Sequence, residues 1–244
     1  MDNQTRDKTL TGLWAHFDRI YCISVEERGD RRLEARRQFD AVGLTGRVEF
    51  VIVRKHPTDP EQGIYESHME CFRRGVRAGA RVISLFEDDI VFDRFSPRVL
   101  AGCVDFLATH AAWDLFFFGC LSAGSRRTQN PAVRKVSYRS LTHAYAVRRG
   151  FAETLLGVPR CGLPYDALLS AQAGETYAAY PSFAFQSSSP SDNERRRRLD
   201  RFRRLCGGLI RIQKMDEWYH RHQGAVIGAH LVLAALLVAL IVWR

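Results

Sequence analysis

The stretch at residues 80–93, ARVISLFEDDIVFD, constrains the fold of this chain more than any other. It opens with β-branched and aromatic residues, ends that run in three consecutive carboxylates, and then resumes as Ile-Val-Phe. An unbroken apolar run of this length is typical of a strand covered on both faces, as in a parallel sheet. Ligands of open α/β sheets bind outside the carboxyl ends of such strands. The stretch therefore predicts an α/β fold with a candidate site at Glu87, Asp88 and Asp89.

The three carboxylates favour a site for a metal ion and a phosphate. Grouped acids repel one another, which raises their pKa values unless a cation lies close by. Mg²⁺ and Mn²⁺ prefer carboxylate oxygen, and Mg²⁺ is commonly held by one or two carboxylates together with substrate phosphates. A solvated acidic turn is the alternative, and the Glu-Asp-Asp string alone does not choose between the two.

A strand–helix–strand unit precedes this stretch. Residues 17–25 and 48–53 are predicted strands, and residues 31–42 between them are predicted to form a helix that Gly43 ends. This order favours a βαβ unit and a parallel sheet. Arg31, at the start of the helix, belongs either to a solvated face or to a contact with a diphosphate.

A second helix is predicted at residues 64–75, directly before the acidic strand. It carries Ser67 and His68 on its apolar face. A lone histidine on such a face is commonly a hydrogen-bonded core residue. The short path from this helix to the acids keeps a role in the site open as well.

The rest of the apolar pattern extends the α/β alternation. Predicted strands lie at residues 113–119, 138–147 and 180–186, predicted helices lie at residues 98–109 and 150–156, and residues 121–133 are polar and predicted to be a loop on the acceptor side. Asp166 stands between a proline turn and the start of an apolar helix. An aspartate at such a position is often an N-cap, and a functional role is the alternative.

The C-terminal part of the chain has a different composition. The net charge is +9, and residues 194–222 supply +6 of it, because ten Lys and Arg residues face four acids there. Residues 224–243 are apolar apart from one histidine, and about twenty apolar residues is the length that spans a bilayer core. We expect a single-pass C-terminal anchor, with the basic segment against anionic lipid on the cytoplasmic leaflet. A buried terminal helix is the alternative. Nucleic acid is not expected as a partner, because aromatic residues are sparse in the basic segment.

These features divide the chain into four parts. They are a polar lead at residues 1–16, a catalytic domain at residues 17–192, a basic amphipathic segment at residues 193–223 and a transmembrane helix at residues 224–243. The six cysteines include no C-x-x-C pair, which argues against a zinc site. With no apolar segment near the N-terminus, a reducing, cytoplasmic location is expected for the catalytic domain.

The ordered motifs resemble glycosyltransferase family 25, the lipopolysaccharide and collagen sugar-transferase family. The matching segments are IYCISVEERGDRRLEARRQFDAVGL, GIYESHMECF, LFEDDIVF, WDLFFFG, THAYAVRRGFAETLL, LPYDALL and FQSSSPSD. Their order and spacing agree with the family across residues 17–192, although no single motif is specific. The resemblance implies a GT-A-like fold with a mostly parallel sheet, a nucleotide-sugar donor such as a UDP-sugar, and Mn²⁺ or Mg²⁺. It also implies a surface-polysaccharide, lipopolysaccharide-type or other membrane-presented acceptor.

The resemblance assigns roles residue by residue. Glu87 and Asp89 match acids that bind the metal and the diphosphate, and Asp166 matches the acid expected to act as general base. The positions implied to bind the donor are Arg31, Ser67, His68, Asp88, Tyr145 and Gln186. Strand one departs from the family at Ser24-Val25, where Asn-Leu is usual, and Ile64 replaces a cysteine.

Two other functions compete with sugar transfer. A metal-dependent phosphoryl or nucleotidyl transferase also needs clustered acids, but the chain has no P-loop and no Gly-rich phosphate cradle. A membrane-anchored scaffold with weak or no activity is the non-enzyme alternative, because a fold alone does not fix function.

Overall fold

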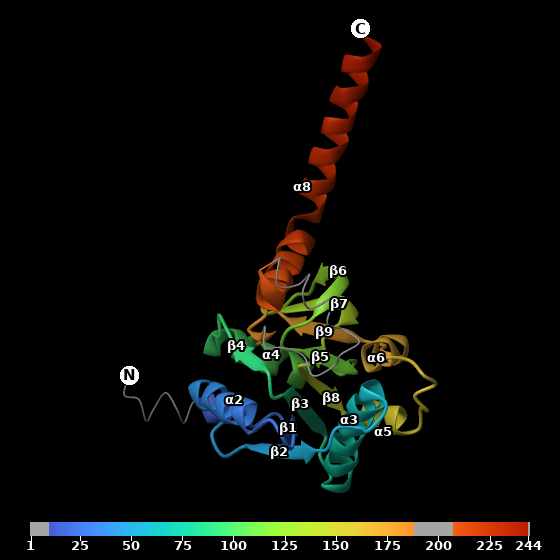
Figure 1. Ribbon diagram of the computed structural model, residues 1–244. Helices are drawn as coiled ribbons and strands as arrows, with labels where there is room; N and C mark the ends of the chain where they lie inside the picture. Colours follow the sequence, from blue (N-terminus) through green and yellow to red (C-terminus); the bar gives the residue numbers. More distant parts are fainter. Residues whose placement is uncertain (1–9, 188–206, 244) are drawn as a thin grey trace.

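The computed structural model describes residues 10–187 and 207–243 (Figure 1). A helical turn at residues 10–14 precedes the first strand. The strands are β1 Arg19–Val25, β2 Val48–Val53, β3 Val82–Glu87, β4 Ile90–Phe92, β5 Leu115–Phe117, β6 Leu121–Arg127, β7 Val133–Ser140, β8 Ala144–Arg148, β9 Thr176–Ala179 and β10 Ala184–Gln186. The helices are α2 Gly29–Ala41, α3 Pro60–Arg77, α4 Pro97–Thr109, α5 Arg149–Leu156, α6 Tyr165–Gln172 and α8 Gly208–Val242.

One eight-stranded sheet, in the order β2-β1-β3-β8-β5-β9-β7-β6, forms the centre of the fold. β7 and β8 are antiparallel to their neighbours, and the other six strands share one direction. The predicted α/β fold with a mostly parallel sheet is therefore confirmed. A separate two-stranded sheet joins β4 to β10, directly beyond the acidic end of β3.

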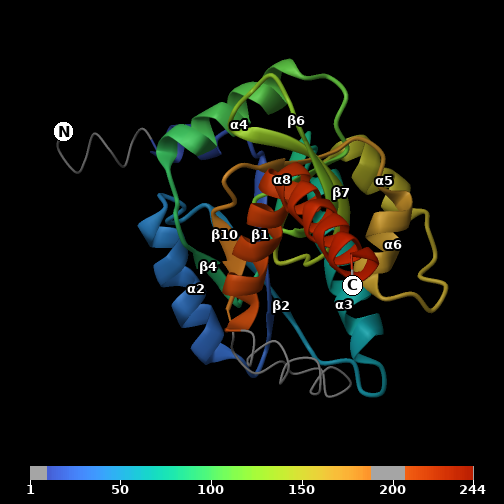
Figure 2. The same ribbon diagram turned by 90° about the horizontal axis from the view of Figure 1, so that it is seen from above.

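Helices cover both faces of the sheet, as the view from above shows (Figure 2). On one face, α2 and α4 contribute Phe39, Leu100 and Leu107 to a core that also contains Trp14. On the other face, α3, α5 and α6 pack through Phe72, Leu155, Leu168 and their neighbours. Successive side chains of β3 enter the two cores alternately, and this explains why residues 82–86 of the strand are apolar except for the buried Ser84.

The prediction of a polar loop at residues 121–133 is wrong. These residues form β6 and the turn into β7, and the two strands pair as an antiparallel hairpin. The pattern gave no signal because β6 is an edge strand with few buried side chains, and its register shifts next to Gly124.

Two further predicted strands differ from the structure. Residues 138–147 hold parts of two strands, β7 and β8, because the chain turns at Leu141, where φ is 80°. Residues 180–186 form a strand only over β10, whereas β9, which was not predicted, comes immediately before them.

The C-terminal helix α8 is one continuous helix with two different environments. Its first turns pack on the α/β domain: Gln213 donates to the Ala184 carbonyl (2.9 Å), and Asp216 accepts from the Ser122 amide (3.1 Å). Glu217 likewise accepts from the Ser182 amide at 2.8 Å. The docked part of α8 thus lies against β6 and β10, while residues 193–206 of the predicted basic segment lie outside the described residues.

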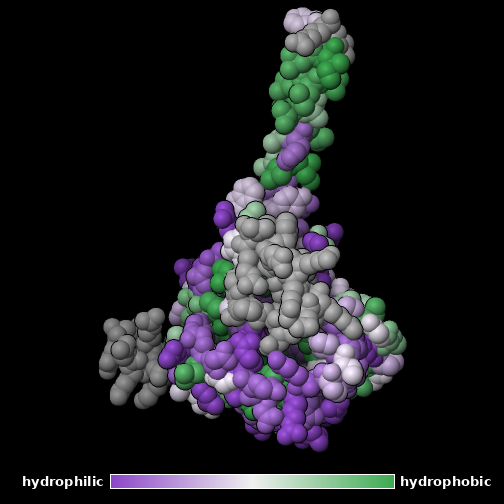
Figure 3. Space-filling model, viewed as in Figure 1, coloured by the Kyte–Doolittle hydropathy of each residue, from purple (hydrophilic) through white to green (hydrophobic). Residues whose placement is uncertain are grey.

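The remainder of α8 projects away from the domain. Residues 224–241 are almost entirely exposed and form an apolar column (Figures 1 and 3). By length and composition this helix could cross a membrane, and the hydrophobic part is 0% buried by the rest of the protein. The alternative of a buried terminal helix does not hold, because the apolar residues have no protein surface against them.

Candidate active site at the acidic end of strand β3

The three acids lie where β3 ends, at the carboxyl edge of the parallel part of the sheet. Glu87 is the last residue of β3, Asp88 and Asp89 form the turn, and β4 follows directly. Backbone hydrogen bonds fix this turn on both sides: the Glu87 amide donates to the His143 carbonyl, and the Asp88 amide donates to the Ile23 carbonyl. The ends of β1 and β8 therefore determine where the acids lie.

Asp88 is bound through both carboxylate oxygens. The Ser24 hydroxyl donates to Oδ2 at 2.6 Å, and Arg31 Nη1 lies 3.5 Å from Oδ1. Burial raises the pKa of Asp88, and the contacts with Ser24 and Arg31 counteract part of that rise. Asp88 thus links the end of β1 to the start of α2, and neither of its oxygens lacks a protein partner.

Asp89 has one oxygen that the described residues do not satisfy. Gln186 donates to Oδ2 at 2.9 Å, and Arg31 Nη1 lies 3.8 Å from the same atom. Oδ1 is buried and has no hydrogen-bond partner among the described residues. Burial and the negative charge of Glu87 raise the pKa of Asp89 to about 7. A nearby cation would stabilise the ionised form of Asp89, because one oxygen of this carboxylate has no partner and its ionisation is otherwise unfavourable.

The pKa of Glu87 shifts in the direction opposite to that of Asp89. Burial acts against its ionisation, but interactions with His68 and Thr142 outweigh this and lower the pKa of Glu87. Thr142 donates to Oε1 at 2.8 Å, and His68 Nε2 lies 3.7 Å from the same oxygen. Both contacts use Oε1, so Glu87 is an ionised carboxylate held through one of its two oxygens.

A buried chain of hydrogen bonds connects His68, the neighbour of Glu87, to Tyr145 and Tyr165. His68 Nδ1 and the Tyr145 hydroxyl are 2.8 Å apart, and the Tyr145 and Tyr165 hydroxyls are also 2.8 Å apart. The Tyr165 ring stacks on the imidazole with centroids 4.1 Å apart. Burial raises the pKa values of both phenols, which therefore stay protonated. Because Glu87 can only accept, the tautomer with hydrogen on Nε2 suits this arrangement, and Nδ1 then accepts from Tyr145.

The Tyr145→Phe variant is expected to be less stable by about 1–3 kcal/mol, because it leaves buried polar atoms of His68 and Tyr165 without a partner. Thermal unfolding followed by circular dichroism measures the loss. Tyr180→Phe is a matched control, since its hydroxyl makes no hydrogen bond to a described residue and should leave the melting temperature unchanged. Equal melting temperatures for all three proteins would contradict the buried network.

Two other residues predicted for the site, Ser67 and Asp166, lie on α3 and α6. Ser67 is buried and donates within its own helix to the Gly63 carbonyl at 2.6 Å, so its hydroxyl is used locally. Asp166 is the second residue of α6 and follows Tyr165, the residue stacked on His68. Burial is the main cause of the raised pKa of Tyr165, and the negative charges of Glu87 and Asp166 add to the rise. The structure thus brings Asp88, Asp89, Arg31 and Gln186 into direct contact. Glu87, next to them in the chain, contacts Thr142 and His68 instead, and Tyr145 lies behind His68.

Glu87 and Asp89 suit a metal ion whose remaining ligands are oxygen atoms of the substrate. Among residues 10–187 and 207–243, no group of three or more His, Cys, Asp or Glu side chains is arranged to hold a metal by itself. Asp89 Oδ1 is an unused buried ligand, and Glu87 is ionised beside it. Mg²⁺ is often held by one or two carboxylates with substrate phosphates completing the coordination, which is the kind of site these two acids can supply.

Two partners of the acids, Ser24 and Thr142, are not predicted from the sequence as site residues, and neither is Tyr165, which stacks on His68. Ser24 was noted only as a departure from the family, although the parallel register of Ile23 with Glu87 places it next to Asp88. Thr142 and Tyr165 gave no signal, because their positions depend on how β8 and α6 pack.

Comparison with known proteins gives a short sequence match. No protein-family model matches the chain. A glycosyltransferase 25 family member from Anopheles gambiae is 29% identical over 125 residues, which cover 41% of this chain and 21% of that protein. The chain therefore spans about a fifth of the length of this relative.

Several solved structures resemble the fold. A197 from STIV has a TM-score of 0.42 at 13% identity, covering 69% of this chain and 85% of that one. A glycosyltransferase involved in glycosylation of the major capsid of PBCV-1 has a TM-score of 0.39 at 9% identity, covering 66% and 81%. Mannose-1-phosphate geranyltransferase from Thermus thermophilus has a TM-score of 0.40 at 10% identity, covering 66% and 73%. All three TM-scores lie below 0.5, so these similarities do not identify a function.

Proposed function

We propose that the protein is a metal-dependent glycosyltransferase of the family 25 type that uses a nucleotide-sugar donor, with a UDP-sugar as the expected class. The observation that carries the proposal is the buried, unpartnered oxygen of Asp89 beside ionised Glu87 at the carboxyl end of β3. A diphosphate with its divalent cation supplies the positive charge and the oxygen ligands that such a pair lacks. The short match to a glycosyltransferase 25 family member agrees with this assignment.

The three acids have different roles in binding the donor. Glu87 and Asp89 would hold Mn²⁺ or Mg²⁺, which when bound neutralises charge on the departing nucleoside diphosphate. Asp88 keeps the turn in place through Ser24 and Arg31. Arg31, 13% exposed and within 4 Å of two of the acids, is placed to meet a diphosphate at the same edge. Gln186 orients Asp89 from β10.

The proton of the acceptor hydroxyl needs a separate base. Glu87 and Asp89 are assigned to the cation, and His68 is 1% exposed and bonded to Tyr145, so none of these is free to receive that proton. Asp166 lies at the start of α6, half-exposed, and is the carboxylate we assign as general base. Ser67, His68 and Tyr145 then act by supporting α3, β8 and Glu87 rather than by touching the donor.

Release of nucleoside diphosphate tests the proposed reaction. Full-length protein in detergent micelles is incubated with a panel of nucleotide sugars, Mn²⁺ and membrane extracts that supply acceptors. Sugar transfer with stoichiometric release of nucleoside diphosphate is the expected outcome. Release of a sugar 1-phosphate or of a nucleoside monophosphate instead would favour the nucleotidyl or phosphoryl transferase, and no turnover with any donor would favour the scaffold.

We further propose that α8 anchors the catalytic domain to a membrane and that the acceptor is a membrane-presented glycan or glycolipid, of which a lipopolysaccharide precursor is one class. Trp218 and Tyr219 are exposed near the base of the projecting segment, and Trp243 is exposed at its far end. Aromatic residues at both ends of an apolar helix suit the two interfaces of a bilayer. The basic residues before the helix favour a cytoplasmic position for the domain.

Membrane fractionation with a carbonate wash is expected to leave the full chain in the pellet, because a spanning helix is not extracted at high pH. A variant that ends after Gln223 is the matched control, since it keeps the docked part of α8 and loses only exposed residues. It should appear in the supernatant. Recovery of the full chain in the supernatant would contradict the anchor.

A further inference from the structure

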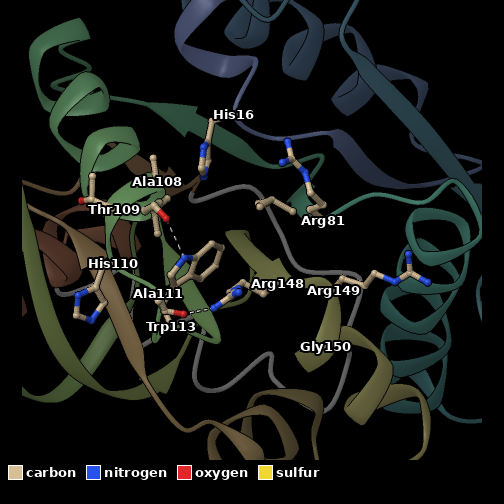
Figure 4. Close-up of a pocket in the computed structure, with 12 residues that line it drawn as sticks. His16, Arg81, Ala108, Thr109, His110, Ala111, Trp113, Arg148, Arg149 and Gly150 are labelled. Atoms are coloured by element: carbon tan, nitrogen blue, oxygen red, sulfur yellow. Dashed lines mark hydrogen bonds between the residues drawn. The ribbon is translucent and has the colours of Figure 1, made fainter.

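A pocket of about 620 Å³ lies at the end of the sheet opposite the acids (Figure 4). It is formed by the first residues of β3, the junction of β8 with α5 and the segment that follows α4. Strand β3 separates it from the acids, and the five residue steps from Val82 to Glu87 correspond to roughly 17 Å. The pocket is therefore distinct from the proposed donor site.

The wall of this pocket is cationic. Its lining residues include three arginines and two histidines, and no aspartate or glutamate. Arg148 donates to the main-chain carbonyl of Ala111 and makes no ion pair with a described carboxylate. Arg81 is 86% exposed and lies 3.6 Å from Asp18, whose other oxygen already accepts from two backbone amides. Of the three arginines, Arg149 is paired with Glu153 and Arg81 lies near Asp18, so Arg148 carries the charge that no described carboxylate compensates.

The start of α5 adds hydrogen-bond donors to the same wall. Arg148 occupies the N-cap position and makes no side-chain cap hydrogen bond. Gly150 in the first turn lines the pocket, and open space lies where a Cβ would be. The Arg149 amide already donates to the Arg81 carbonyl at 2.8 Å, so this terminus offers an anion the Gly150 amide, which has no partner among the described residues, and the helix dipole.

The other walls are apolar or neutral. Trp113 is 3% exposed and donates its indole N–H to the Leu107 carbonyl, so it offers a ring surface rather than a donor. Burial is the main cause of a lowered pKa for His16, and Figure 4 shows its imidazole directed into the pocket from the side opposite Arg148. His16 Nε2 has no hydrogen-bond partner among the described residues. An anion with an organic body suits this combination of walls better than a free ion does.

We propose that this pocket binds a phosphorylated small molecule, with the phosphate between Arg81, Arg148 and the first turn of α5. A volume of about 620 Å³ lies within the size range of small-molecule sites, roughly 300–1,000 Å³. Arg149 is not part of the anion contact: it bonds Glu153 on its own helix at 2.8 Å and points away from the pocket in Figure 4.

Isothermal titration calorimetry with pyrophosphate tests the proposal. The full-length protein is used in detergent micelles at ~0.15 M salt, where nonspecific attraction is screened. EDTA is present, so that metal-dependent binding at the acids of β3 does not contribute. Wild type is expected to bind pyrophosphate, and to bind it more tightly than inorganic phosphate.

Three variants distinguish the pocket from other anion sites. Arg148→Gln should weaken pyrophosphate binding about tenfold or more through loss of charge-assisted hydrogen bonds. Arg149→Gln, the neighbouring control, should change the affinity by no more than about twofold, because its charge is already paired with Glu153. Arg31→Gln, beside the acids of β3, should leave pyrophosphate binding unchanged. Arg81→Gln replaces Arg148→Gln if the latter does not melt cooperatively.

Three results would overturn the proposal. They are absence of pyrophosphate binding at millimolar concentration, equal weakening by the Arg148 and Arg149 substitutions, and loss of binding in Arg31→Gln. The last result would place the anion at the acids of β3. Because EDTA removes the metal-dependent reaction, failure of this proposal leaves the proposed glycosyltransferase activity untouched.

Discussion

Asp89→Asn is expected to abolish transfer and, without divalent cations, to make the protein more stable. Ionised Asp89 is unfavourable in the folded protein, since burial and Glu87 raise its pKa from 3.8 to about 7. A folded-state pKa above the unfolded one means that the contribution of Asp89 to wild-type stability falls as pH rises from about 4 to about 7. At pH 8 the gain from Asn is at most about 4 kcal/mol. Activity should fall by about 10³-fold, because metal stabilisation of a leaving group is worth several kcal/mol.

Thermal unfolding in EDTA between pH 4 and pH 8 measures the stability effect. Relative to wild type, Asp89→Asn should gain stability as pH rises across this range, because the other titrating groups, among them His16 and His143 with their lowered pKa values, are common to both proteins. Glu87 does not interfere, because its pKa is lowered and its contribution to stability disappears only as pH falls below about 4.5. Asp105→Asn, on the exposed side of α4, is the matched control and should match wild type in both assays. A less stable Asp89→Asn protein at pH 8 would contradict the electrostatic assignment.

Asp166→Asn is expected to lower kcat by about 10²–10⁴-fold while leaving donor affinity within about twofold, because only the proton transfer is lost. The asparagine keeps the size and the helix position of the aspartate. Single-turnover transfer gives the rate, and calorimetry with the nucleotide sugar and Mn²⁺ gives the affinity. The matching substitution Asp105→Asn controls for a nonspecific loss of charge.

A parallel loss of donor affinity in Asp166→Asn would move this residue into the donor site. A rate within about threefold of wild type would remove it from the reaction altogether, since general-base catalysis is typically worth at least about 10²-fold. Because Asp166 is half-exposed at the start of α6, its replacement is expected to leave the fold intact, and the melting temperature of the variant checks this.

The sequence was sufficient to predict the parallel half of the sheet. β1, β2, α3 and β3 each have a recognisable apolar pattern, because each packs on a core. α2 buries only Ala35 and Phe39, and its prediction depended mainly on Gly43 and on its place between two strands. β6 and β9 were not predicted. β6 lies at the sheet edge with polar side chains, and β9 has only four residues, so neither carries enough pattern to recognise.

The site was predictable only where chain order determines proximity. Glu87, Asp88 and Asp89 follow a recognisable strand, and their position at its carboxyl end follows from the fold. The different ionisation of Glu87 and Asp89 depends on Thr142, Gln186 and His68, which reach the acids from three other parts of the fold. Such a difference appears only when β8, β10 and α3 are packed together. For the same reason, the arginine-lined pocket gave no sequence signal.

The most direct test of the central claim is a thermal-shift titration of the full-length protein with UDP-sugars, performed with Mn²⁺ and with EDTA. If Glu87 and Asp89 hold a metal and a diphosphate, UDP-sugar and Mn²⁺ together should raise the melting temperature of wild type more than the sum of their separate effects. The synergy should vanish in Asp89→Asn and persist in Asp105→Asn. Equal stabilisation of wild type in Mn²⁺ and EDTA, or synergy that survives in Asp89→Asn, would contradict a metal–diphosphate site at the end of β3.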